Sequence, residues 1–106
     1  MEEQENYEII IVIVNEGFSD VVMNAARDAG ARGGTITHAR GTGTKEMEKK
    51  YGIVITPQKE MLYILVNEKI RDAVMSAINK AVGLDTPGQG IVFSLPVSNI
   101  SGIKLD

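Results

Sequence analysis

Two copies of one segment, displaced by 52 residues, occur in this sequence. Residues 14–29 and 66–81 share eight identities in sixteen ungapped positions, where chance gives about one. The apolar run at 9–13 lies opposite a second apolar run at 61–65. The identities fall on Val14, Asn15, Glu16, Asp20, Val22, Met23, Ala25 and Ala29 and on their counterparts 52 positions later. A repeat that spans half of the chain and occurs twice predicts a duplicated domain.

Each copy is predicted to form a strand, a helix and a second strand. Residues 7–14 are β-branched and almost wholly apolar, which is typical of a strand buried on both faces. The helix that follows should bury one apolar stripe, made of Phe18, Val21, Val22, Ala25, Ala26 and Ala29. The second helix repeats this stripe with Ile70, Ala73, Val74, Ala77, Ile78 and Ala81. We expect Asn15 and Asn67 to cap the two helices and Gly30 and Gly83 to end them.

Further strands are expected at 33–41, 61–66 and 91–95, so the element order is βαββαβ. Chain economy and right-handed crossovers then predict an α+β fold of the ferredoxin-like class, an antiparallel sheet with two helices on one face. Residues 1–106 form a single domain in this interpretation.

The rest of the chain is expected to be irregular. Residues 1–6 form a frayed tail, 42–58 an extended loop with a strand-like Ile53-Val54-Ile55 near its end, and 97–106 a C-terminal extension.

The opposite face of this sheet should be apolar and uncovered, because the first and third strands are apolar at successive positions. Such a face usually marks an interface, and we expect a closed ring of identical subunits. The alternative is that the C-terminal extension covers the face.

Composition excludes several classes of function. The chain has no Cys, which rules out disulfides, thiol nucleophiles and thiolate metal sites. A net charge of −3 and the absence of Trp argue against nucleic acid as a partner. The acidic start and the lack of an apolar run of about 20 residues predict a cytoplasmic location.

Two glycine-rich elements are candidates for a binding site. They are Arg40-Gly41-Thr42-Gly43-Thr44 and Thr86-Pro87-Gly88-Gln89-Gly90. Glycine permits close approach of the backbone to a ligand and lets N–H groups converge on phosphate. Each element alone also fits a plain turn, but the βαββαβ order brings both towards one edge of the sheet, which favours a ligand.

Catalysis and metal binding are not indicated. His38 is the only histidine, so a metal site there would need carboxylate partners, and a surface or interface imidazole is expected instead. Nothing places His38 beside a particular serine. Residues 45–50 are interpreted as a solvated loop or a short helical turn with a Glu46–Lys50 pair.

At the glycine-rich elements the chain resembles the nitrogen-regulatory PII superfamily of signalling proteins. The resemblance covers about residues 8–104 and is carried by residues 30–37 running into 40–43, and by residues 88–93 running into Val97. It implies a homotrimer packed sheet face to sheet face, with ATP or ADP between subunits. It also implies that a loop after the second strand docks onto target proteins.

The resemblance assigns ligand-binding roles to several residues. Thr35, Gly41 and Gly43 correspond to positions that frame the adenine and the base of the loop. The Gly88-Gln89-Gly90 turn corresponds to the phosphate-cradling loop, and Lys59 to the lysine just before the third strand.

The chain also departs from the family pattern. Ile91 stands in place of the phosphate-binding lysine, Gly102 and Lys104 in place of two arginines, and Lys45 in place of a glutamine that helps to bind 2-oxoglutarate with metal and ATP. Lys104 keeps a positive charge, and we expect it to bind the ligand together with Lys59. The loop is shorter than usual, and Tyr51 cannot be equated with the tyrosine that some members modify. We therefore interpret the chain as a divergent member with a shortened loop.

These observations predict a regulatory sensor without turnover. The expected effector is AMP, ADP or a cyclic relative, in preference to ATP with 2-oxoglutarate, because charged phosphate contacts are lost. Residues 44–52 would order on binding and signal to a membrane transporter or an enzyme. Alternatives are a small ferredoxin-like enzyme (an acylphosphatase-like hydrolase or an isomerase), a CutA-like or structural adaptor trimer, and another anion such as bicarbonate as the ligand.

Overall fold

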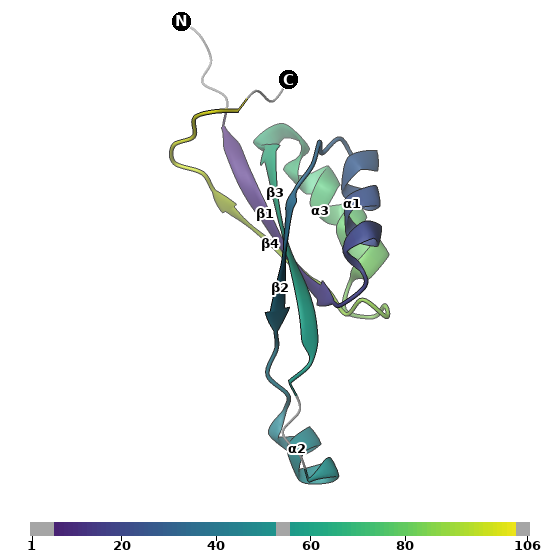
Figure 1. Ribbon diagram of the computed structural model, residues 1–106. Helices are drawn as coiled ribbons and strands as arrows, with labels where there is room; N and C mark the ends of the chain where they lie inside the picture. Colours follow the sequence, from purple (N-terminus) through teal and green to yellow (C-terminus); the bar gives the residue numbers. More distant parts are fainter. Residues whose placement is uncertain (1–5, 53–55, 104–106) are drawn as a thin grey trace, which may run out of the picture.

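Four strands form one antiparallel sheet in the order β2-β3-β1-β4, with two helices on one of its faces (Figure 1). The computed structural model describes residues 6–52 and 56–103. The strands are β1 (Tyr7–Asn15), β2 (Thr35–Arg40), β3 (Gln58–Asn67) and β4 (Ile91–Pro96). The helices are α1 (Ser19–Asp28), α2 (Lys45–Tyr51) and α3 (Glu68–Val82). The predicted ferredoxin-like fold is confirmed, and the strand-like segment 53–55 lies outside the described residues.

The core lies between the sheet and the helices α1 and α3. In β1 and β3 every second residue faces the helices, as the period of a strand requires. The buried apolar residues of the two strands are Ile10, Val12, Val14, Leu62, Ile64 and Val66, and those of the helices are Val22, Met23, Ala26, Val74, Ile78 and Val82. Both copies of the repeat therefore contribute equivalent residues to one shared core.

The buried stripe of α1 differs by one position from the predicted stripe. Residues 19, 22, 23 and 26 are buried, whereas Val21 is 41% exposed. Ala73, the counterpart of Val21 in α3, is exposed as well, so packing against the sheet sets the same buried face in both helices. The start of α1 is delayed to Ser19 by a turn at Gly17, whose φ of 97° lies in the left-handed region that glycine tolerates.

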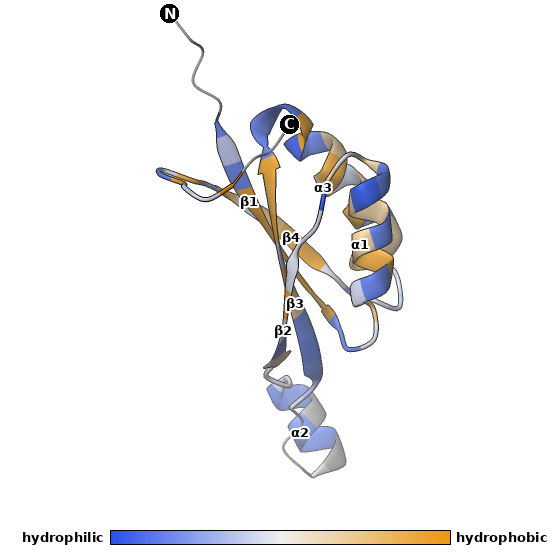
Figure 2. Cartoon of the chain, turned by 45° about the horizontal axis from the view of Figure 1, so that its top comes forward, coloured by the Kyte–Doolittle hydropathy of each residue, from blue (hydrophilic) through white to orange (hydrophobic). Residues whose placement is uncertain are grey.

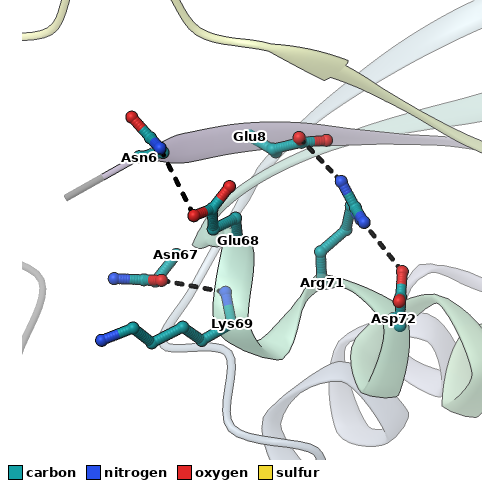
Figure 3. Close-up of polar contacts among 7 residues, drawn as sticks. All are labelled: Asn6, Glu8, Asn67, Glu68, Lys69, Arg71 and Asp72. Atoms are coloured by element: carbon teal, nitrogen blue, oxygen red, sulfur yellow. Dashed lines mark hydrogen bonds and ion pairs between the residues drawn. The ribbon is translucent and has the colours of Figure 1, made fainter.

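The two asparagines of the repeat have different roles. Asn67 caps α3, since its side chain accepts a hydrogen bond of 2.9 Å from the Lys69 amide (Figure 3). The same role predicted for Asn15 is wrong, because the turn at Gly17 separates Asn15 from the start of α1. Gly30 follows α1 with a φ of 113°, as expected of a residue that ends a helix.

The sheet face opposite the helices is apolar and uncovered within the described part of the chain. Strand pairing aligns Leu65, Ile9 and Leu95 in one row, Tyr63, Ile11 and Phe93 in the next, and Met61, Ile13 and Ile91 in a third. Phe93 is 39% exposed and Ile91 56% exposed. Figure 2 shows the apolar colour along the central strands. The described part of the C-terminal extension, residues 97–103, does not bury these side chains.

Glu60 is a buried carboxylate that ties β3 to the start of α1. Its Oε1 accepts a hydrogen bond of 2.8 Å from the Gly17 amide. The nearby Ser19 hydroxyl and the hydrogen bond from the Gly17 amide lower the pKa of Glu60 from its ordinary value of 4.5. The negative charge of Glu60 is therefore part of the folded structure.

Leu62→Ala should destabilise the protein by about 2–5 kcal/mol, because Leu62 is fully buried at the centre of the sheet. Leu84→Ala is the matched control, since Leu84 is 72% exposed, and it should change the free energy of unfolding by less than about 0.5 kcal/mol. Urea unfolding at one fixed protein concentration measures both. Equal losses in the two variants would contradict the described core.

Glu60 should also make stability depend on pH. Since its pKa is lowered in the folded state, its contribution is fully present above the unfolded value of 4.5 and is lost as the pH falls through the folded value. We expect the unfolding free energy of the Glu60→Gln variant to fall less steeply below pH 4.5 than that of the unmodified chain. Urea unfolding across this range measures the slopes, and Glu16→Gln, on the exposed turn nearby, is the control. Identical slopes for Glu60→Gln and the unmodified chain would refute this role.

Candidate functional site

The two glycine-rich elements lie at the same end of the sheet. Strand pairing places Lys59, near the start of β3, beside Asn15 at the end of β1 and beside Ala39 near the end of β2. Ile91, at the start of β4, pairs with Ile13 of β1. The loop that leaves β2 and the loop that enters β4 therefore lie at the same end of the sheet, on its two outer strands.

Asn15 connects Lys59 to the second glycine-rich loop. Its Oδ1 accepts a hydrogen bond of 2.6 Å from Lys59 Nζ, and its Nδ2 donates to the Pro87 carbonyl at 2.9 Å. The Asn15 amide donates to the Gly88 carbonyl, also at 2.9 Å. Sequence reasoning missed this role because a polar residue before a helix is the usual signal for a cap. The contact fixes an ammonium group beside the loop.

Gly41 lies against the start of β3. Its amide donates to the Pro57 carbonyl at 2.8 Å. A Cβ at this position would lie 3.2 Å from Pro57 Cγ and 3.4 Å from Lys59 Cε. Glycine therefore allows the β2 end to approach the lysine closely. Gly43 follows two residues later, before α2.

The loop at 86–90 closes on itself by hydrogen bonds. The Gln89 amide donates to the Thr86 carbonyl at 3.0 Å, and the Gly90 amide donates to the Val82 carbonyl. A Cβ on Gly90 would lie 2.5 Å from that same carbonyl oxygen. The Gly90 amide is thus already used in this conformation, although we expected it to be open to phosphate. Packing against α3 by itself explains why position 90 is glycine.

Thr35 lies away from the other predicted site residues within one chain. It pairs with Tyr63 of β3, four residues from Lys59, a separation of about 13 Å along the strand. The register places Thr35, Tyr63 and Lys59 on the uncovered face of the sheet. Lys104 lies outside the described residues.

His38 and Glu60 lie on the other face of the sheet. The distance from His38 Nδ1 to Glu60 Oε2 is 3.9 Å, and the His38 side chain is largely exposed. The described residues include no group of three or more His, Cys, Asp or Glu side chains that could hold a metal ion.

α2 occupies the loop between β2 and β3 and projects from the end of the sheet (Figure 1). Of the two conformations expected for residues 45–50, the structure shows the helical one. Two acidic residues, Glu46 and Glu48, lie in the first turn of α2 after Lys45, and Lys49 and Lys50 lie in its last turn, where positive charge complements the helix dipole.

No helix in the described part of the chain combines the length and the apolar character that a membrane crossing requires.

Comparison with known folds supports the architecture. The structure superimposes on PII of Arabidopsis thaliana, solved bound to citrate, with a TM-score of 0.68 and 23% identity over 90% of this chain and 80% of that chain. A Bacillus cereus protein related to NIF3 matches with a TM-score of 0.72 and 15% identity over 92% of this chain, which spans only 27% of that longer protein. At these identities the likeness shows the fold alone.

Sequence comparison gives the family. No curated protein matches the chain closely enough to be informative. The family model described as nitrogen regulatory protein P-II matches residues 7–106, almost the whole sequence. The chain therefore belongs to the nitrogen regulatory protein P-II family, and it is a regulatory signalling protein.

Proposed function

We propose that this protein senses an adenine nucleotide in clefts between the subunits of a homotrimer and signals through the segment around α2. One observation carries the proposal. The uncovered apolar sheet face ends beside Lys59 and the loop at Gly88, which Asn15 connects by hydrogen bonds.

The trimer is supported by the chemistry of the uncovered face. Three cross-strand rows of large apolar side chains remain exposed or half-buried, and a face of this kind is stable when a second surface removes it from water. A ring of identical subunits would also bring together predicted site residues that are far apart within one chain. Thr35 and Lys59 share a face, but Tyr63, the partner of Thr35, lies about 13 Å from Lys59 along β3, so a neighbouring copy is needed to bring Thr35 to the Lys59 end.

The residues at this end of the sheet support an anionic ligand of modest charge. Lys59 offers one fixed ammonium group, and Ile91 presents an exposed apolar side chain where the family pattern has a lysine. Gly102 offers no charge. Because each charge-assisted contact is strong, the loss of two favours AMP or ADP over ATP with 2-oxoglutarate. The citrate in the Arabidopsis structure is likewise an anion.

The signal would pass through residues 44–52. This segment contains α2 and lies between the end of β2 at Arg40 and the start of β3 at Gln58, which flank Gly41 and Lys59. A ligand that contacts Gly41 and Lys59 would bias the orientation of α2. A partner protein, either a transporter or an enzyme, would recognise the orientation of α2.

Phe93→Glu should convert the trimer into monomers, since it places a charge in the middle row of the apolar face. Sedimentation velocity at micromolar concentration gives the oligomeric state. Leu84→Glu is the matched control, because Leu84 is exposed outside the sheet, and it should leave the trimer intact. A monomeric unmodified chain would overturn the proposal of a trimer.

ADP or AMP should bind with measurable heat, and Lys59→Met should weaken binding by roughly tenfold or more, because it removes one charge-assisted contact. Lys80→Met, near the end of α3, is the charge-matched control and should bind normally. Gly90 is unsuitable as a probe, since any side chain there would meet the Val82 carbonyl. Isothermal titration supplies the dissociation constants, and a nucleotide hydrolysis assay is run on each ligand that binds.

The titration and the hydrolysis assay together distinguish the alternative functions. Micromolar binding of ATP with magnesium and 2-oxoglutarate, without binding of AMP or ADP, would refute the inference from the missing charges. Turnover would favour the enzyme alternative. No heat with any nucleotide or with bicarbonate would favour a structural adaptor.

A further inference from the structure

The duplication places two equivalent glutamates at two equivalent sites. Glu8 near the start of β1 and Glu60 near the start of β3 are 52 residues apart, the offset of the repeat. Both lie on the helix-facing side of the sheet. Because β1 and β3 are antiparallel, Glu8 meets the start of α3 and Glu60 meets the start of α1.

In one copy a guanidinium group joins two carboxylates. Arg71 Nη1 lies 2.8 Å from Glu8 Oε2, and Arg71 Nε lies 3.0 Å from Asp72 Oδ1 (Figure 3). The planar fork of arginine suits this arrangement, since it can donate to both carboxylates at once.

In the other copy the carboxylates are present without the arginine. Glu60 and Asp20 are the counterparts of Glu8 and Asp72, but Ser19 stands at the position of Arg71. Glu60 Oε1 accepts from the Gly17 amide, and the nearest basic group to Oε2 is the His38 imidazole at 3.9 Å. Among the described residues, neither Glu60 nor Asp20 therefore forms an ion pair with a lysine or an arginine.

A cleft occupies the place that corresponds to the arginine. It has a volume of about 320 Å³ and is lined by Gly17, Ser19, Asp20, Ile36, His38 and Glu60. This volume is at the lower end of the range for small-molecule sites. The cleft exists because α1 starts three positions later in the repeat than α3, and because serine is much shorter than arginine.

We propose that this cleft binds an alkylguanidinium group, which takes the place that Arg71 has in the second copy. Glu60 and Asp20 accept hydrogen bonds from the guanidinium, and the exposed Ile36 contacts the alkyl chain. The cleft is separate from the proposed nucleotide site, because Glu60 and Lys59 are neighbours in β3 and face opposite sides of the sheet. Either site can therefore fail a test without the other.

Titration with agmatine, followed by the NMR signals of the Gly17 amide and the His38 ring, tests the proposal. We expect saturable shifts with a dissociation constant of about 1 mM. Butylammonium, which has the same charge without the planar fork, should bind roughly tenfold more weakly. Glu60→Gln and Asp20→Asn should each weaken agmatine roughly tenfold. Glu16→Gln, an exposed change outside the cleft, is the matched control and should bind normally.

A second titration distinguishes a free amino acid from a protein side chain as the source of the guanidinium group. Tighter binding of free L-arginine than of agmatine would indicate an amino acid, whereas equal binding of agmatine and an N-acetyl arginine amide would indicate a protein side chain. Both results support the guanidinium site.

The proposal is overturned if no signal saturates up to about 10 mM agmatine, ten times the expected constant. It is also overturned if Asp20→Asn binds agmatine as the unmodified chain does. Asp20 is exposed, so this variant decides the question even if Glu60→Gln does not fold.

Discussion

The contact between the helices α1 and α3 and one side of β1 and β3 is the interaction on which the rest of the structure depends. Every fully buried large side chain in the described residues lies in these four elements, and each copy of the repeat supplies a strand and a helix. Neither copy could bury its apolar side alone, because one strand and one helix leave most of that side in water. The duplication therefore produces a single core that is shared by both halves.

Use of one sheet face for this core leaves the other face uncovered by the described residues, and the candidate sites follow from that division. Residues of β3 alternate between the two faces, so Lys59 and Glu60 are adjacent in sequence and belong to different surfaces. Lys59 lies on the uncovered apolar face, beside the glycine-rich loops. Glu60 lies on the side that faces the helices and lines the cleft beside α1. Two chemically opposite surfaces, one cationic and one anionic, thus arise from one strand.

The two copies of the repeat differ at positions that matter for the candidate sites. Asn67 caps α3, whereas Asn15 links Lys59 to the Pro87 carbonyl. Arg71 neutralises Glu8, whereas Ser19 leaves Glu60 beside an open cleft. The first difference follows from the turn at Gly17 that delays α1, and the second from serine standing where the other copy has arginine. Two positions that are structural in the second copy are therefore candidate binding positions in the first.

The sequence by itself determined the βαββαβ order, the apolar character of β1 and β3 on both faces, the end of α1 before Gly30 and the membership of the P-II family. These features are local or periodic, so spacing along the chain reports them. The tertiary structure alone decided the role of Asn15, the face of α1 that holds Met23, and the closed conformation of the loop at Gly90. Each depends on contacts between different elements of the fold, such as Lys59 beside Asn15, 44 positions away. Hydrogen bonds of this kind are set by how the elements pack, and no sequence pattern records them.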